Sequence, residues 1–159
     1  QVRKLDRIAA DIRAVAKRVY DGIADMPGLK TRLLPDPAGE LGAGVYVDLG
    51  TKEARDRLLA AMRAENVPAS GPSGSVVLPV QPYAEKTLPV NQAWPTFNSA
   101  RGKAIQYGAA SCPRTLDILG RFGGVLLDPG YTEADTRDIV AAFRKVYPQV
   151  RAQSARPSA

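Results

Sequence analysis

A run of hydrogen-bond donors beside a glycine is the segment of this chain best suited to hold an anion. Asn98, Arg101 and Lys103 surround Gly102 in the stretch Asn98-Ser99-Ala100-Arg101-Gly102-Lys103. A guanidinium next to backbone N–H groups can bind a phosphate or a carboxylate. The spacing matches neither the P-loop nor the glycine-rich dinucleotide fingerprint. A solvated loop is therefore the favoured interpretation of this segment. Asn98 and Arg101 are its candidate substrate contacts.

The residue types that are missing argue against several other chemistries. The chain has no histidine, and Cys112 is its only cysteine. An internal disulfide, a Cys-His site and histidine-dependent catalysis are therefore excluded, and no metal site is expected. Cys112 is interpreted as a small packing residue.

The composition is that of an ordinary folded domain. A length of 159 residues suits one domain, with 45% hydrophobic and 24% charged residues. The net charge of +6 comes from 22 basic and 16 acidic residues, but several basic residues lie near the chain ends: Arg3, Lys4, Arg151 and Arg156. No apolar run approaches the roughly 18 to 20 residues of a membrane span, and no signal peptide opens the chain. We expect a soluble, cytoplasmic protein.

A long amphipathic helix is predicted over residues 3–23. Its apolar residues recur at steps of three and four and form one stripe: Leu5, Ile8, Ile12, Val15, Val19 and Ile23. Pro27-Gly28 ends the helix. Such a stripe alone would equally suit a bundle helix or a short coiled coil.

The segments beyond this helix predict a small sheet with helical cover. Thr51 can cap a helix over residues 52–65, with Asn66 at its end, and Pro35 to Gly39 form a turn. Short strands are expected at residues 29–34, 44–49, 76–78 and 125–127. The first two should pair as antiparallel neighbours. The predicted fold class is α/β, with a mainly antiparallel sheet of three or four strands covered by helices.

The segment from residue 66 to residue 100 is long, weakly charged and rich in proline. Glu85 and Lys86 are its only charged residues, and it contains six prolines. It also carries apolar and aromatic side chains that disordered linkers lack: Val76, Val77, Leu78, Val80, Tyr83, Trp94 and Phe97. We expect this loop either to lie against a substrate or partner surface, or to pack as a plain Ω-like loop.

The last third of the chain reads as a short helix, a strand and a capped helix. Cys112-Pro113 opens the short helix, and Thr132 stands where its hydroxyl can accept a bond from the third backbone N–H of the final helix. The apolar residues of the final helix fall on one side: Ile139, Val140, Phe143 and Val146. This order, with Cys112-Pro113 and Pro129-Gly130-Tyr131-Thr132-Glu133-Ala134-Asp135, resembles the C-terminal end of the DegT/StrS family of sugar aminotransferases.

The resemblance implies that the chain is the C-terminal small domain of a fold-type-I, pyridoxal-phosphate-dependent enzyme. Residues 1–26 would form a connecting helix, 27–147 the small domain with its 66–100 loop, and 148–159 a disordered tail. The parent enzyme would transfer an amino group to a keto-sugar or keto-cyclitol as a homodimer, and this domain would close the site and help to select the substrate. None of the seven lysines has the Ser/Thr-rich setting of the family's cofactor lysine. The chain alone, without its large domain, would therefore bind no cofactor and be inactive.

The resemblance also implies two substrate contacts. In the family, a proline-rich motif with a histidine and a following tyrosine approaches the sugar. Pro79-Val80-Gln81-Pro82-Tyr83 is similar to that motif but has no histidine. Gln81 and Tyr83 are thus the candidates for contacts to sugar hydroxyls, and no histidine role carries over.

A basic α/β module that binds RNA without catalysis is the alternative from another class. Against it, no predicted strand interleaves the aromatic and basic residues on which RNA bases stack. A piece of a larger enzyme should instead leave apolar surface uncovered along its first helix and its long loop. The side chains expected in that surface are Leu5, Ile8, Ile12, Val15, Val19, Val76, Leu78, Tyr83 and Trp94.

Overall fold

The computed structural model describes residues 2–72, 77–81 and 99–154. The chain divides into two compact units. The first unit comprises residues 1–71 together with 121–159, and the second comprises residues 72–120. The second unit is therefore inserted into the sequence of the first.

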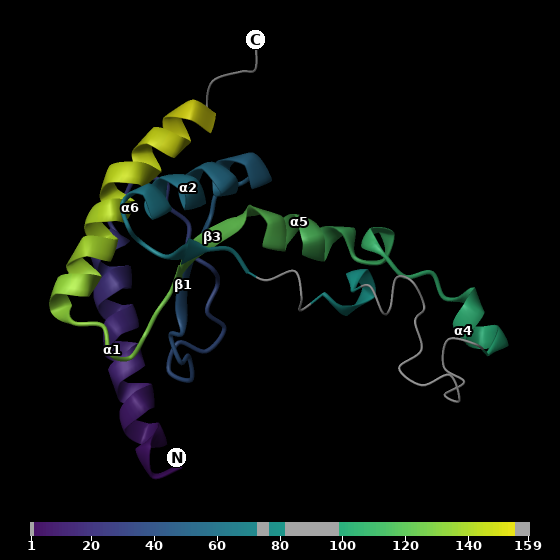
Figure 1. The fold of residues 1–159 in the computed structure, drawn as a ribbon, viewed down its shortest axis with the longest axis horizontal. Helices are drawn as coiled ribbons and strands as arrows, with labels where there is room; N and C mark the ends of the chain where they lie inside the picture. The colour runs from purple at the N-terminus through teal and green to yellow at the C-terminus, as the bar shows by residue number, and fades with distance from the viewer. Residues whose placement is uncertain (1, 73–76, 82–98, 155–159) are drawn as a thin grey trace. The chain divides into compact units, whose positions relative to one another are not determined.

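A three-stranded antiparallel sheet forms the centre of the first unit (Figure 1). Strand β3 (Phe122–Leu126) lies between β1 (Gly44–Asp48) and β2 (Ala69–Ser70). β1 pairs with β3 along its whole length, from Gly44 opposite Leu126 to Asp48 opposite Phe122. The predicted α/β class with a small antiparallel sheet is confirmed.

Three long helices pack around this sheet: α1 (Leu5–Ile23), α2 (Lys52–Ala64) and α6 (Glu133–Ser154). A 3-10 turn, η1 (Val2–Lys4), precedes α1. α6 packs against both α1 and α2, while α1 also contacts β1 and α2 contacts β2 and β3. The fully buried side chains at the centre of this core are Val15, Val19, Ile23, Val45, Val47, Leu58, Met62, Val125 and Phe143.

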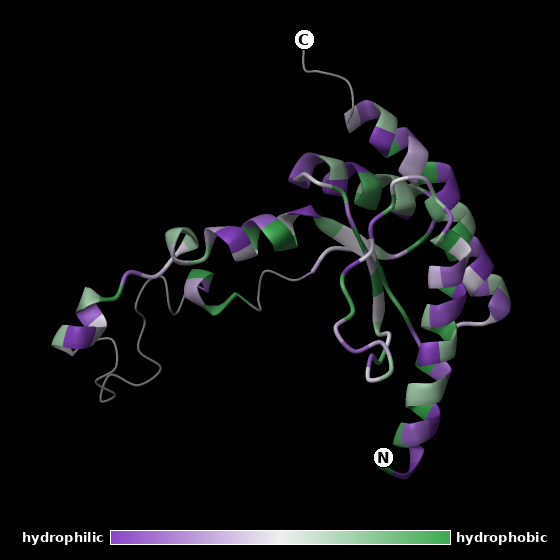
Figure 2. Ribbon diagram, turned by 180° about the vertical axis from the view of Figure 1, so that it is seen from behind, coloured by the Kyte–Doolittle hydropathy of each residue, from purple (hydrophilic) through white to green (hydrophobic). Residues whose placement is uncertain are grey.

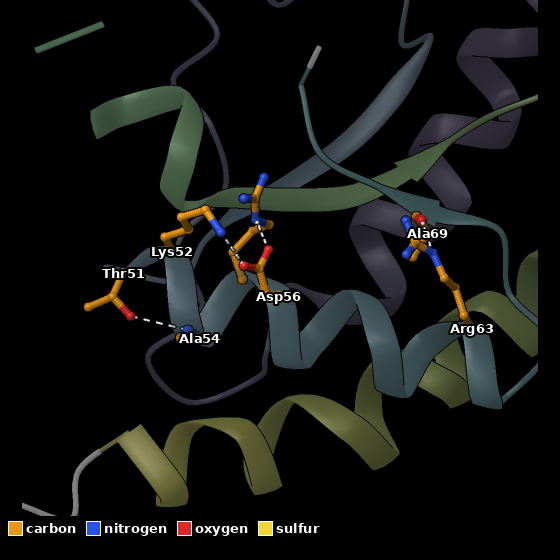
Figure 3. A network of polar contacts seen from close by, with 7 residues as sticks. Thr51, Lys52, Ala54, Asp56, Arg63 and Ala69 are labelled. Carbon is orange, nitrogen blue, oxygen red and sulfur yellow. Dashed lines mark hydrogen bonds and ion pairs between the residues drawn. The ribbon is translucent and has the colours of Figure 1, made fainter. Parts of the chain in front are cut away.

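Capping residues set the ends of these helices as the sequence predicts. The Thr51 hydroxyl accepts a hydrogen bond of 3.1 Å from the backbone N–H of Ala54 (Figure 3). Thr132 accepts one of 3.2 Å from the N–H of Asp135, and the Asp135 carboxylate accepts one of 2.7 Å from the N–H of Thr132 in return. This reciprocal pair has the geometry of a capping box. Asn66, at φ 62°, ends α2 in the left-handed conformation that asparagine tolerates.

The strand predicted over residues 29–34 is wrong except at one position. Thr31 forms an isolated antiparallel bridge with Val47, supported by hydrogen bonds from the N–H of Arg32 to the carbonyl of Tyr46 and from the N–H of Asp48 to the carbonyl of Lys30. The ladder partner of β1 is β3 instead. Pro35 and Pro37 lack the N–H groups that a longer strand would need.

The strand predicted over residues 76–78 is also wrong where the structure describes it. Leu78 starts a 3-10 turn, η3 (Leu78–Val80), because the ring of Pro79 restricts the backbone and removes a donor. The third strand is formed by Ala69 and Ser70. β3 begins at Phe122, ahead of the strand expected at 125–127. Gly123 and Gly124 pair with β1 and so belong to the strand, although glycine is a poor strand former.

Helix α6 runs further than the domain end expected at residue 147. It continues through Pro148 to Ser154, so residues 148–154 are helical rather than a disordered tail. An internal proline removes one helical hydrogen bond, but packing holds the last turns in place. Val150 is buried, and the Arg151 guanidinium donates to the carbonyl of Pro27.

The apolar stripe of α1 is only partly uncovered. Ile12, Val15 and Val19 are buried, because this part of the helix packs on the core, and their predicted exposure is wrong. Leu5 and Ile8 are exposed to 59% and 41%, as predicted, and Val2 to 84%. In Figure 2 the ribbon of α1, next to the N-terminus, alternates between hydrophobic and hydrophilic residues. Uncovered apolar side chains are therefore concentrated at the N-terminal end of the helix.

Candidate functional site

Two of the four predicted substrate contacts, Gln81 and Arg101, lie in the second unit. Tyr83 and Asn98 lie outside the described residues, as do Val76 and Trp94 of the predicted apolar surface. The arrangement of the four as one site therefore stays a prediction.

Gln81 follows directly on the turn η3. Its backbone N–H donates to the carbonyl of Leu78 at 3.0 Å, and its side-chain amide lies 3.5 Å from the carbonyl oxygen of Val77. Val77 is buried, whereas Leu78 is exposed to 60%. The half-buried amide of Gln81 is thus positioned by its own turn. The exposure of Leu78 agrees with the predicted apolar surface of the loop.

Arg101 lies on a short helix, α4 (Ala100–Ala104). Ser99 caps this helix by accepting a hydrogen bond of 2.9 Å from the N–H of Gly102. Gly102 is buried, while Arg101 and Lys103 are exposed. The favoured expectation of a solvated loop is therefore wrong for residues 100–104, because the Ser99 cap starts a short helix there, on which both cations are exposed.

The second unit also holds helix α5 (Pro113–Arg121), preceded by the 3-10 turn η4 (Ala109–Ser111). The predicted helix start at Cys112-Pro113 is confirmed. α5 contains no buried residue, and its apolar side chains Leu116, Ile118 and Leu119 are only half-buried. An amphipathic helix that buries nothing lacks the packing that normally stabilises it.

Covalent attachment of pyridoxal phosphate needs a lysine whose ammonium is destabilised by burial or by a neighbouring cation. All six described lysines are exposed. Three of them form surface ion pairs: Lys17 with Asp21, Lys52 with Asp56, and Lys145 with Glu65. None of the described lysines is therefore destabilised by burial, and no catalytic step is assigned to them. Lys86 lies outside the described residues.

The segment between α1 and β1 holds a polar cluster that sequence reasoning missed. Arg32 pairs with Glu40 at 2.5 Å, and the N–H of Gly42 donates to the Glu40 carboxylate at 2.9 Å. These bonds lower the pKa of Glu40, while burial beside the same pair raises the pKa of Tyr20. Arg13 of α1 donates to the backbone carbonyl of Glu40 at 2.9 Å. The cluster holds the loop against α1. It could not be predicted from the sequence, because its residues form no known motif.

The sheet does not support the RNA-binding alternative. The strands read Gly44-Val45-Tyr46-Val47-Asp48, Ala69-Ser70 and Phe122-Gly123-Gly124-Val125-Leu126, and none contains lysine or arginine. A base-stacking sheet combines aromatic side chains with cations that reach the phosphates. These strands provide no such surface.

In the described ranges, no helix is both long enough and apolar enough to cross a membrane. The sequence matches no protein-family model, and no curated protein is significantly similar to it.

Two solved structures resemble the chain in fold. One is a DegT DnrJ EryC1 StrS aminotransferase from Brucella abortus, with a TM-score of 0.55 and 18% identity over 91% of this chain and 32% of that one. The other is the aminotransferase TlmJ from Streptoalloteichus hindustanus, with a TM-score of 0.62 and 13% identity over 98% of this chain and 35% of that one. At these identities the likeness shows the fold alone. The predicted fold, a small α/β domain of such aminotransferases, is confirmed, and the chain spans about a third of their length.

Proposed function

We propose that this chain is the C-terminal small domain of a pyridoxal-phosphate-dependent aminotransferase of the DegT/StrS family that acts on a keto-sugar or keto-cyclitol. The observation that carries the proposal is the fold match, which takes in 91% and 98% of this chain but only about a third of two aminotransferases. The sequence supports it independently. Both segments that carry the family resemblance adopt the local structure expected of them, the helix start at Pro113 and the capped start of α6 after Thr132.

The rest of the enzyme would hold the cofactor. Pyridoxal phosphate would be bound by a large domain, because the described lysines do not fit its attachment. Homodimer formation and a cytoplasmic location also belong to this proposal, by analogy with the family.

The uncovered apolar side chains support a missing neighbour. Val2, Leu5 and Ile8 are exposed at the end of α1 where preceding chain would join, and α5 buries none of its residues. Apolar side chains left uncovered in this way are what an interaction surface requires. We assign the end of α1 to the large domain and α5 to closure of the active site.

Substrate selection would fall to the second unit. Gln81 and Tyr83 would bind hydroxyl groups, and Asn98 and Arg101 would contact a carboxylate or phosphate on the substrate. Groups of these types are suited to a polar, neutral ring with an anionic substituent.

The test compares the two half-reactions of the full-length enzyme. We expect Gln81→Ala or Tyr83→Phe to lower kcat/KM for the keto substrate by about two- to tenfold, the cost of one lost hydrogen bond to a neutral group. The half-reaction with the amino donor, followed by the absorbance of the cofactor, should be unchanged. Ser111→Ala is a control in the same unit, because its hydroxyl donates only locally, to the carbonyl of Gln106. Equal kinetics of wild type and variants in both half-reactions would assign the loop a structural role, and absence of any transamination would refute the proposal.

A further inference from the structure

A cavity of about 430 Å³ opens on the first unit, between the segment after α1, the turn after β1 and the last turns of α6. Its volume lies within the range of roughly 300 to 1,000 Å³ typical of small-molecule sites. Leu49, Tyr147 and Val150 supply apolar lining, and the last two are buried. Leu49 is half-buried and is therefore the one of these three that offers a ligand more than a small apolar surface.

Three cations line the same cavity: Lys30, Arg121 and Arg151. Asp48 is the one carboxylate among the lining residues, and it lies 3.1 Å from Arg121 while also accepting a hydrogen bond from the N–H of Gly50. One negative charge thus faces three positive charges. The ammonium group of Lys30 forms no ion pair with any described carboxylate, so its charge is not neutralised within that part of the chain.

Arg151 is held in place without being neutralised. Gly28 adopts φ 70°, and a Cβ there would clash with the Arg151 guanidinium, which lies against the backbone and donates to the carbonyl of Pro27. Tyr147 fixes the same segment by donating to the carbonyl of Gly28 at 2.7 Å. A guanidinium has five N–H donors, and a single one of them is bonded to the described residues. The remaining donors are available to a ligand.

We propose that this cavity binds a small phosphorylated molecule. Lys30 and Arg151, with Arg121 beside them, hold the phosphate, and the apolar part of the ligand lies against Leu49. A phosphate dianion matches the two uncompensated positive charges, and guanidinium groups bind its oxygens with directed hydrogen bonds. This binding site stands independently of the proposed aminotransferase function.

The experiment titrates the full chain with phenyl phosphate and with inorganic phosphate, and follows backbone amide signals by NMR. We expect saturable shifts at Gly28, Lys30 and Gly50, and tighter binding of phenyl phosphate than of inorganic phosphate. Lys30→Gln with Arg151→Gln should weaken binding by about tenfold or more, because charge-assisted hydrogen bonds are lost. The control pair Lys17→Gln with Lys145→Gln removes the same charge elsewhere on the unit and should change the affinity by less than about twofold, since exposed ion pairs contribute little.

Equal losses in the two double variants would overturn the site in favour of diffuse attraction by a basic surface. Absence of saturable shifts would overturn it as well, and equal affinity for the two phosphates would overturn the apolar contact. Circular dichroism checks that the variants are folded. If the double variant does not fold, Lys30→Gln alone, at an exposed side chain, provides the same test.

Discussion

Gly124 lies in the middle of the central strand β3, opposite Tyr46 of β1. A Cβ at this position would clash with the carbonyl oxygen of Val45 and with the backbone of Tyr46. The two backbones therefore approach more closely than any residue with a side chain permits. Glycine at position 124 is therefore required for this close approach of β1 and β3.

We expect Gly124→Ala to destabilise the chain by about 1 to 3 kcal/mol, as overpacking of a buried site does. Urea unfolding measures the change. Gly120→Ala is the matched control, because a Cβ there meets nothing within 4 Å and the residue is helical. The control should leave stability unchanged or raise it slightly. Equal destabilisation by both substitutions would contradict the assigned strand contact.

The capping carboxylate of Asp135 should make the stability of α6 depend on pH. Its hydrogen bonds with Thr132 lower the pKa of its carboxyl group below the ordinary value. A carboxyl group whose pKa is lower in the folded state than in the unfolded state stabilises the protein at pH values above the unfolded-state pKa, which is about 3.9 for aspartate. This stabilisation is lost as the pH falls through the folded-state pKa.

We therefore expect Asp135→Ala to be less stable than the wild type at neutral pH, with a difference that shrinks as the pH falls below about 4. Thermal unfolding across a pH series measures this difference. Asp138→Ala is the control, because Asp138 is exposed on the same helix and its carboxylate makes no hydrogen bond or ion pair with the described residues. A difference that does not depend on pH would show that the charge of Asp135 plays no part.

At the scale of elements, α6 packs against both α1 and α2 in the core of the first unit. Gly22 of α1 lies where a side chain would clash with Val140 of α6, so the two helices approach closely. Farther along, Arg144 donates to the carbonyl of Gly22 at 2.8 Å and also pairs with Asp25. Burial along α1 increases from its start to its end.

This gradient of burial predicts a large loss of stability on truncation of one isoleucine of α1 and almost none on truncation of another. Ile23 is fully buried, and its replacement by alanine should lower the free energy of unfolding by about 2 to 5 kcal/mol. Ile8, exposed to 41%, should change stability by less than about 0.5 kcal/mol. Chemical denaturation of Ile23→Ala and Ile8→Ala provides the comparison. A large loss for Ile8→Ala would show that the start of α1 packs within the chain.

The sequence was a good guide to elements whose signal is local. The apolar period of α1 and the hydroxyl caps at Thr51 and Thr132 predict the long helices correctly, since neighbouring residues decide them. The partner of β1 was missed because Gly123 and Gly124 carry no strand signal, although they pair with a strand far away in sequence. Residues 148–154 were misjudged because Pro148 argues locally against a helix that packing around Val150 sustains. Of the candidate site, Gln81 directly follows the turn η3 and Arg101 lies on the short helix α4, and neither local structure was predicted. Whether the four candidates converge depends on Tyr83 and Asn98, which lie outside the described residues.

At the scale of the molecule, the chain spans about a third of the length of two aminotransferases that it resembles in fold. Among the described residues of the second unit, few side chains are buried. The activity proposed here accordingly belongs to the whole enzyme.

Mixing the chain with pyridoxal phosphate should yield only the spectrum of the free aldehyde. The reason is that all described lysines are exposed, so none has an ammonium group destabilised by burial, and three of them are paired with surface carboxylates. Reduction with borohydride followed by mass spectrometry should find no stoichiometric adduct, whereas the full-length enzyme, as the positive control, should give one. A saturable adduct at one lysine of this chain would contradict its assignment as a domain without the cofactor site.

The position of β3 in the sequence has a consequence for biosynthesis. β1 and α1 emerge from the ribosome early, yet the strand that pairs with β1 starts at Phe122, and the helix that covers α1 follows only from Glu133. Chains are made at about 5 to 20 residues per second and domains fold as units. The nascent first unit must therefore wait several seconds, with β1 unpaired and Val15 and Val19 uncovered, until translation has passed the inserted second unit. A ribosome that stalls within that insertion would hold an unfolded, aggregation-prone intermediate, and chaperones would find their binding surface there.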